Sequence, residues 1–256
     1  METQCIAVPT SEGQRAIGIL KNADLLDTKF RIESDENYLY LPVVEITTSQ
    51  KLLQDSNIPA HVTFAMLEHK KTRPKSIAEV LHTVIPENLW KDIPSSFDII
   101  GDKIVVEIKP SLNEFEADIG MAFMFVHPSV TSVYRKEGAV SGSYRIRPVR
   151  LIAGKDEPLT IHREYGLAIV VDVSKVYFSP RLSTEHARVA SLANEGERIL
   201  DMFCGVGSFP LHIAKNVDAE ITAIDLNPDA IECLKKSIAL NRKTLKGRIN
   251  PIQSDI

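Results

Sequence analysis

The chain has 256 residues, of which 44% are hydrophobic and 25% charged, a composition typical of a globular protein. It contains no apolar run approaching the roughly 20 residues that cross a bilayer, and Met1–Gln4 lack the basic and apolar regions of a signal peptide. The three cysteines are an odd number without ligand-like spacing. These features argue against a membrane protein and a disulfide-stabilised secreted protein, so we expect a cytoplasmic protein with no membrane partner.

Basic residues are concentrated in one segment, although the net charge of the chain is −4. The total charge argues against a polyanionic partner. Residues 135–150, however, contain a single acid, Glu137, against five basic residues: Arg135, Lys136, Arg145, Arg147 and Arg150. A local run of this kind matters more for RNA binding than the total charge, but a solvated strand face would have the same composition.

The first part of the chain predicts a small α+β module over residues 1–48. A short strand at 6–9 precedes Ser11-Glu12-Gly13-Gln14, which resembles a capping box that opens a helix to about Ala23. Residues 29–32 and 38–41 flank a polar turn and are typical of a hairpin. The following residues, 49–74, are mostly polar, and we expect them to form a linker with one short helix at 49–55.

Residues 75–173 predict a second α+β domain. Ser76 and Glu79 have the spacing of a capping box at a helix start. Apolar alternation then predicts a helix over 115–127 and strands over 103–108, 130–136, 144–153, 159–164 and 166–171. These strands carry the basic run, so this domain is the expected RNA-binding and catalytic part.

Residues 174–256 predict a Rossmann-like domain built around one glycine corner. A helix begins at Ser183, and the short apolar strand 199–201 ends in Asp201. Gly205 and Gly207 follow, and then residues 211–215 open a helix. The order of strand, glycine turn and helix is that of the nucleotide-binding corner of a doubly wound α/β sheet. Glycine is needed where the backbone turns sharply and a ligand approaches closely.

The corner fits S-adenosylmethionine better than a dinucleotide. A dinucleotide fold has a third glycine where this chain has Pro210, which disfavours a nicotinamide oxidoreductase. Three acids instead follow successive predicted strands: Asp201, Asp225 and Asp255. An acid after the second strand binds ribose hydroxyls in this architecture. Any one of these acids alone would more simply be a cap or turn residue.

Several stretches resemble the archaeal-type tRNA (guanine-37-N1) methyltransferases, and the resemblance extends over essentially the whole chain. They are residues 93–102 (Ile-Pro-x-Ser-Phe-Asp-Ile-Ile-Gly-Asp), Tyr144-Arg145, His162-Arg163-Glu164-Tyr165-Gly166, the run 171–185 and the glycine corner. The run Tyr177-Phe178-Ser179-Pro180-Arg181-Leu182 is specific, whereas the corner alone indicates only a class I methyltransferase. The resemblance implies a monomer that binds tRNA, with residues 1–48 as a tRNA-binding module.

The resemblance also implies the roles of individual residues. Arg145 would contact the reacting guanine, and Glu185 would be the general base that removes the N1 proton. Tyr177 and Arg181 would shape the nucleoside and guanine site. The complete set expected to bind the cofactor is Tyr177, Arg181, Asp201, Phe203, Gly205, Gly207, Asp225, Leu226, Asn227 and Asp255.

The chemistry agrees with these roles. Guanine N1 carries a proton at neutral pH, so it becomes a nucleophile only when a base removes that proton. A fixed guanidinium at Arg145 would stabilise the negative charge that develops on O6. Glu185 stands at a helix start, where the dipole lowers its pKa, so burial would have to offset this effect. On the residues alone, Arg145 is equally a surface cation and Glu185 a first-turn acid.

The chain departs from the family pattern in three ways. His186 stands where an arginine is common, so a phosphate contact there is in doubt, and Cys204 replaces the usual alanine. The 256 residues also lack the Asn-Pro-Pro-like motif that holds the target base. We therefore expect a fragment that is inactive or poorly folded by itself. The alternatives are the related aminocarboxypropyl transferase of wybutosine synthesis and a protein that binds RNA or nucleoside without catalysis.

Overall fold

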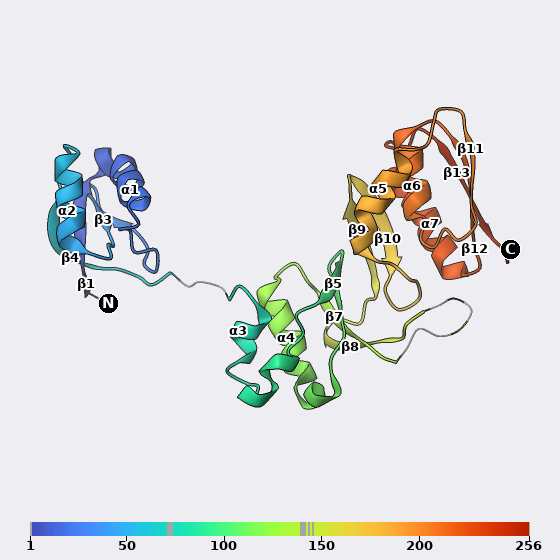
Figure 1. The fold of residues 1–256 in the computed structure, drawn as a ribbon, viewed down its shortest axis with the longest axis horizontal. Coiled ribbons are helices and arrows are strands. Elements are labelled where there is room, and N and C mark those ends of the chain that lie inside the picture. The colour runs from blue at the N-terminus through green and yellow to red at the C-terminus, as the bar shows by residue number, and fades with distance from the viewer. Residues whose placement is uncertain (1, 71–73, 139–141, 143, 145, 256) are drawn as a thin grey trace. The chain divides into compact units, whose positions relative to one another are not determined.

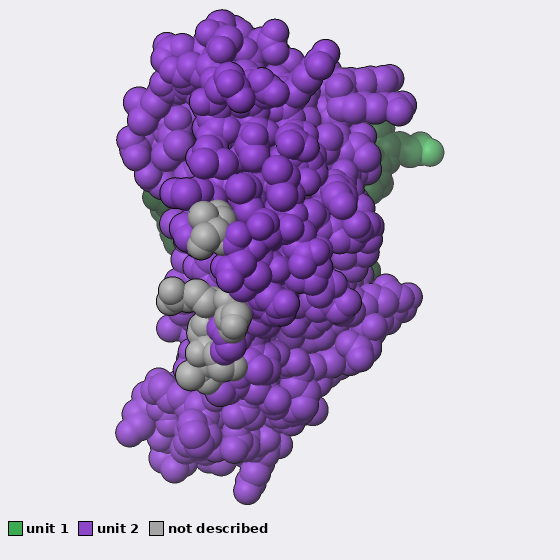
Figure 2. Space-filling model, turned by 90° about the vertical axis from the view of Figure 1, so that its right-hand side faces the viewer, with its two compact units in different colours: residues 1–73 green, residues 74–256 purple. Residues whose placement is uncertain are grey.

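The computed structural model describes residues 2–70, 74–138, 142, 144 and 146–255, and the predicted guanine contact Arg145 lies outside them. The chain forms two compact units, residues 1–73 and residues 74–256, which Figure 2 distinguishes by colour. Figure 1 labels the elements of each unit. None of the helices within the described residues is long and apolar enough to span a bilayer.

Unit 1 is a four-stranded antiparallel sheet with two helices, and its strand order is β2-β3-β1-β4. Its elements are β1 (Glu2–Pro9), η1 (Thr10–Glu12), α1 (Gly13–Asn22), β2 (Glu33–Ser34), β3 (Tyr38–Leu41), α2 (Ile46–Asp55) and β4 (His61–Met66). The central strand β1 is buried on both faces from Cys5 to Val8, which explains its unbroken apolar sequence. It packs with Ala16 and Leu20 of α1 and Leu53 of α2 in one core.

Two predictions for unit 1 were wrong. Ser11 does not cap α1, because residues 10–12 form a 3-10 turn and the helix begins at Gly13. The helix expected at 49–55 is present as the larger part of α2, but residues 49–74 are not a linker, since β4 follows and pairs with β1 over six positions. The sequence of β4 concealed the strand because no side chain in it is buried, so apolar alternation is weak. The first unit therefore extends well beyond residue 48.

Unit 2 begins with a sheet in the order β5-β6-β7-β8, in which β6 and β7 are parallel and the other pairs antiparallel. Its elements are α3 (Ile77–Leu81), η2 (Glu87–Asp92), β5 (Phe97–Ile100), β6 (Lys103–Val106), η3 (Pro110–Phe115), α4 (Glu116–Val126), β7 (Ser132–Lys136) and β8 (Val149–Gly154). Ser76 caps α3 as predicted, with Oγ accepting the N–H of Glu79 at 3.3 Å. α3 and α4 cover the Ile104–Val106–Val133 face of the sheet.

The β9 (Leu159–Glu164) and β10 (Leu167–Asp172) hairpin packs on a helix expected to belong to the next domain. Leu167, Ile169 and Val171 share one core with residues of α7 (Pro228–Asn241). The N–H of Val170 also donates to Ser237 Oγ at 2.8 Å. The packing therefore does not divide after residue 173, where the sequence analysis placed a boundary, because apolar strands alone do not reveal which helix covers them.

The glycine corner lies in a parallel sheet of order β11-β12-β13, with both registers in step. Its elements are η4 (Pro180–Leu182), α5 (Ser183–Ala190), β11 (Arg198–Asp201), α6 (Ser208–Asn216), β12 (Glu220–Asp225), α7 and β13 (Arg248–Gln253). α6 and α7 pack on the face that contains Ile221 and Ala223. On the other face, Leu200 is 58% exposed within the described residues. The described strands thus form a parallel sheet with α6 and α7 on one face, and the second helical layer expected of a doubly wound sheet is not seen over Leu200 among the described residues.

Candidate nucleoside and base site

The bend between β11 and α6 depends on two glycines in the left-handed region. Gly205 has φ +53° and Gly207 has φ +83°. A Cβ on Gly207 would lie 2.2 Å from Leu234 Cδ1, so this glycine allows the helix α7 to pack closely. A Cβ on Gly205 would meet no atom within 4 Å among the described residues. The two glycines therefore differ, because one faces the core and the other faces open space.

Asp225 joins the ends of two neighbouring strands. Its Oδ2 accepts the N–H of Gly205 at 2.8 Å, and its Oδ1 accepts the N–H of Asn227 at 2.8 Å. Hydrogen bonds to an ionised acceptor are stronger than neutral ones. Asp225 consequently fixes the turn after β11 against the turn after β12, and each carboxylate oxygen keeps a second lone pair for a ligand.

Asp201 lies at the end of β11, beside this corner. Its Oδ1 accepts the N–H of Phe203 at 3.1 Å, and burial raises the pKa of the carboxyl above its ordinary value. The Phe203 ring is 81% exposed. This exposed aromatic side chain offers a stacking surface next to the bend.

The segment from Val173 to Arg181 packs against the same corner. Val173 and Val176 are buried in one core with Cys204 and Val206. Asn227 Nδ2 donates to the carbonyl of Lys175 at 2.8 Å, which connects the segment to the start of α7. Tyr177 therefore lies close to the corner, and its side chain is mostly exposed.

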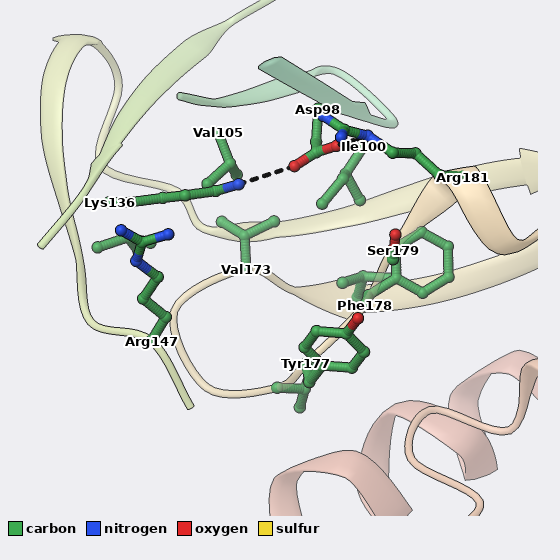
Figure 3. Close-up of a pocket in the computed structure, with 13 residues that line it drawn as sticks. Asp98, Ile100, Val105, Lys136, Arg147, Val173, Tyr177, Phe178, Ser179 and Arg181 are labelled. Atoms are coloured by element: carbon green, nitrogen blue, oxygen red, sulfur yellow. Dashed lines mark hydrogen bonds and ion pairs between the residues drawn. The ribbon is translucent and has the colours of Figure 1, made fainter. Parts of the chain in front are cut away.

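This segment also forms one wall of a cavity of about 290 Å³, shown in Figure 3. Asp98 of β5 binds two cations there, with Oδ2 2.9 Å from Lys136 Nζ and Oδ1 2.9 Å from Arg181 Nε. Arg147 lines the cavity on the side away from Arg181. Three cations and one carboxylate thus line it, an arrangement that attracts an anion such as a nucleic-acid backbone.

Glu185 stands in the first turn of α5, where the sequence analysis expected a general base. Its carboxylate accepts two hydrogen bonds from Arg188, both at 2.7 Å. This pairing lowers the pKa of Glu185 below its ordinary value. The side chain is 44% exposed, so burial does not offset the effect of Arg188.

Three segments of the chain match known protein families. Residues 160–256 match the TRM5/TYW2 methyltransferase domain, residues 77–157 the TYW2 N-terminal domain, and residues 5–51 the tRNA methyltransferase 5 N-terminal domain. The tRNA (guanine(37)-N(1))-methyltransferase Trm5b of Pyrococcus abyssi is 38% identical over 94% of this chain and 69% of its own length. The chain belongs to the Trm5/TYW2 family.

Solved structures of this family resemble the fold described above. The complex of aTrm5 and tRNALeu matches with a TM-score of 0.82 at 35% identity, over 99% of this chain and 75% of that one. Methanocaldococcus jannaschii Trm5 in complex with adenosine matches with a TM-score of 0.57 at 33% identity, over 99% of this chain and 73% of that one. Similarity to tRNA (guanine-37-N1) methyltransferases thus extends over nearly the whole chain.

The other residues that the sequence analysis selected lie in different surroundings. Leu226 and Asn227 follow Asp225 directly, and Asn227 is buried as the cap of α7, where its Oδ1 accepts the N–H of Asp229. Asp255 follows the end of β13. His186 is 3% exposed and its Nδ1 lies 2.7 Å from Glu164 Oε1, so it faces the interior and not a phosphate.

Asp98 is a site residue that the sequence analysis did not select. It lies in the Phe-Asp-Ile-Ile-Gly-Asp stretch that carries the family resemblance, which was the signal available. Lys136 and Arg147 appeared only as members of the basic run. The ion pairs of Asp98 with Lys136 and Arg181 span 38 or more residues, which the sequence does not reveal, and Arg147 lines the same cavity.

Proposed function

We propose that this protein transfers the methyl group of S-adenosylmethionine to N1 of guanosine 37 in tRNA. The observation that carries the proposal is the carboxylate of Asp225, which bonds the turns after β11 and β12. Its neighbour Asn227 donates to the carbonyl of Lys175, directly before the residues Val176 and Tyr177 that line the cavity with the three cations. A nucleoside site thereby lies next to a site for a polyanion. The relatives named above carry the same activity in their names.

The corner suits the donor in shape and charge. The open space beside Gly205 admits a ligand to the backbone. The second lone pairs of Asp225 suit the two hydroxyls of a ribose, as acids at this position do in related folds. The exposed ring of Phe203 offers an apolar surface to a base. A relative has been solved with adenosine, which supports binding of an adenosine-containing donor by this chain.

In the proposed reaction Glu185 accepts the N1 proton of guanine. The freed N1 lone pair would form a bond to the methyl carbon of S-adenosylmethionine as the bond from that carbon to sulfur breaks, and S-adenosylhomocysteine would leave. Arg145 stabilises the negative charge that moves onto O6. Glu185 becomes a stronger base when it leaves Arg188, because the two hydrogen bonds from that residue lower the pKa of its carboxyl. We propose that docking of the tRNA exchanges this pairing for the guanine contact.

The tRNA would lie along the cationic cavity of unit 2, with its phosphates near Lys136, Arg147 and Arg181. Unit 1 would add contacts to the body of the tRNA, as its match to the tRNA methyltransferase 5 N-terminal domain suggests. One relative of this chain has been solved with tRNA. We further propose that the protein works as a cytoplasmic monomer, since the donor corner and Glu185 belong to one chain.

Nucleoside analysis of tRNA tests this proposal. Protein is mixed in excess with tRNA that carries guanosine 37 and with donor labelled in the methyl group, so that one slow turnover suffices. We expect label in 1-methylguanosine at position 37 and none in a matched tRNA with adenosine 37. Label at another position, or tRNA binding without transfer, would contradict the proposal. The same assay decides the expectation that these residues are inactive by themselves.

A second candidate is aminocarboxypropyl transfer to tRNA. It is favoured by the match of residues 77–157 to the TYW2 N-terminal domain. The match of residues 5–51 to the tRNA methyltransferase 5 N-terminal domain favours methyl transfer. Donor labelled either in the methyl group or in the aminocarboxypropyl group separates the two, because each reaction delivers only one of the labels to tRNA.

A further inference from the structure

Three buried side chains from three elements meet behind the glycine corner. They are Glu164 at the end of β9, His186 on α5 and His212 on α6. Each of these residues is at most 5% exposed. One ligand atom from each of them lies within 4.8 Å of the other two. A carboxylate and two imidazoles removed from water require a partner for every polar atom.

The hydrogen bond that His212 makes to Ser208 leaves no proton for its contact with Glu164. Its Nδ1 lies 2.8 Å from the carbonyl oxygen of Ser208, so Nδ1 must carry the hydrogen and donate it. A neutral imidazole has one N–H, and Nε2 then carries a lone pair. That nitrogen lies 3.1 Å from Glu164 Oε1, which also offers only lone pairs when ionised. Two acceptors facing each other repel unless a cation lies between them.

Further buried atoms point to the same place. Among the described residues, His212 Nε2 and the second oxygen of Glu164, Oε2, have no hydrogen-bond partner. Native proteins contain few such atoms, and a bound ion is one cause of their occurrence. Oε1 of Glu164 is shared with His186, whose Nδ1 lies 2.7 Å away. A hydrogen of His186 thus serves Oε1, whereas His212 Nε2 and Glu164 Oε2 receive none from the described residues.

We propose that Glu164, His186 and His212 bind a transition-metal ion of the Zn²⁺ class. Two imidazole nitrogens and a carboxylate oxygen suit zinc, whereas Mg²⁺ and Ca²⁺ favour sites made of oxygen alone. Bonds of about 2.0–2.1 Å in a tetrahedral site separate the ligand atoms by about 3.3 Å. The separations of 2.7 and 3.1 Å from Glu164 Oε1 would therefore widen by about 0.6 and about 0.2 Å, and the two histidine nitrogens already lie within 4.8 Å of each other.

The surroundings provide the remaining parts of a metal site. The bond from His212 Nδ1 to the Ser208 carbonyl fixes the ring with Nε2 toward the ion, as hydrogen bonds behind a metal ligand commonly do. A water molecule can occupy the fourth position, as in three-ligand zinc sites, because the two oxygens of one carboxylate lie too close together for two corners of a tetrahedron. Uptake requires the hydrogen on His186 Nδ1 to move to the other ring nitrogen or leave, since a metal binds the lone pair.

The proposed ion would fix three elements of the fold relative to one another. The ion would join the β9–β10 hairpin to α6, which begins at the glycine bend, and to α5, which carries Glu185 next to His186. It would therefore hold the proposed base at a fixed distance from the donor corner. Because the ion is buried behind these elements, it has no contact with the reacting groups and serves as a structural ion.

Cobalt titration of the full chain tests the proposal. Metal is first removed with a chelator, and Co²⁺ is added while its visible d–d absorption is followed. We expect one equivalent to bind with the bands of a four-coordinate ion, and Zn²⁺ to displace it. The variants Glu164→Gln and His212→Gln should weaken binding by more than about a hundredfold, whereas the matched variant His61→Asn, on an exposed histidine of unit 1, should bind as the unaltered chain does.

Two further measurements keep the proposal falsifiable if a variant does not fold. Zinc X-ray absorption on the unaltered chain should report two imidazoles and a carboxylate around the ion, and added Zn²⁺ should raise its melting temperature. Retention of less than a tenth of an equivalent of Co²⁺ or Zn²⁺ by the folded chain after titration would overturn the proposal. So would NMR spectra that show His212 protonated on both nitrogens and unchanged by Zn²⁺, since a proton would then fill the place assigned to the ion.

Discussion

At the scale of single residues, the two glycines of the bend should contribute differently to the stability of the protein. We predict that Gly207→Ala lowers the free energy of unfolding by about 2–4 kcal/mol, because it combines a left-handed backbone with overpacking against Leu234. Gly205→Ala should cost only about 1 kcal/mol, since its Cβ meets open space. Urea unfolding measures both. Equal losses in the two variants would show that the contact with Leu234 does not matter.

A second prediction at this scale concerns the proton affinity of Glu185. The two hydrogen bonds from Arg188 favour the ionised form and so lower the pKa of the carboxyl. Removing them in Arg188→Ala should raise the pKa toward that of an ordinary glutamate. Carboxyl carbon NMR titration of the two proteins measures this change. Arg198→Ala is the matched control, because that exposed arginine pairs with Glu220 on another element. An unchanged or lower pKa in Arg188→Ala would contradict this prediction.

At the scale of elements, Asn227 connects α7 to the segment that carries Tyr177. It caps α7 through the N–H of Asp229 and donates to the Lys175 carbonyl. Asn227→Ala removes a cap and leaves a carbonyl unpaired, so we predict a loss of about 1–3 kcal/mol in the free energy of unfolding. Asn250 on β13 is less buried and provides the control variant Asn250→Ala, for which we expect a change within about 0.5 kcal/mol. A stability loss of the same size in both variants would argue against the cap.

The elements also explain how far the sequence could lead. The glycine corner and the acids Asp201 and Asp225 were predicted at the right strand ends, because strand, turn and helix follow one another within a few residues. The strand β4 was missed because it has no buried side chain to produce a pattern. Local sequence patterns could not predict contacts between distant residues. Examples are the hydrogen bond from Val170 to Ser237, across 67 residues, and the one from Arg181 to Ser96, across 85.

At the scale of the whole molecule, unit 1 has a core of its own. Ile6, Leu20, Leu41 and Leu53 are fully buried within residues 1–73. We therefore predict that a fragment of residues 1–70 folds by itself, with a modest stability because a domain of this size buries a small core. A cooperative thermal transition by circular dichroism would confirm this prediction. A gradual change without a transition would show that unit 1 needs the remainder of the chain.

The proposed function depends above all on Asp225 at the donor corner, and isothermal titration with S-adenosylhomocysteine tests its role most directly. We predict one binding site per chain and an affinity at least about tenfold weaker in Asp225→Ala, because the variant loses the carboxylate that fixes both turns and faces the ribose. Circular dichroism verifies that the variant is folded. Equal affinity of the folded variant and the unaltered chain would contradict the proposed role of this corner.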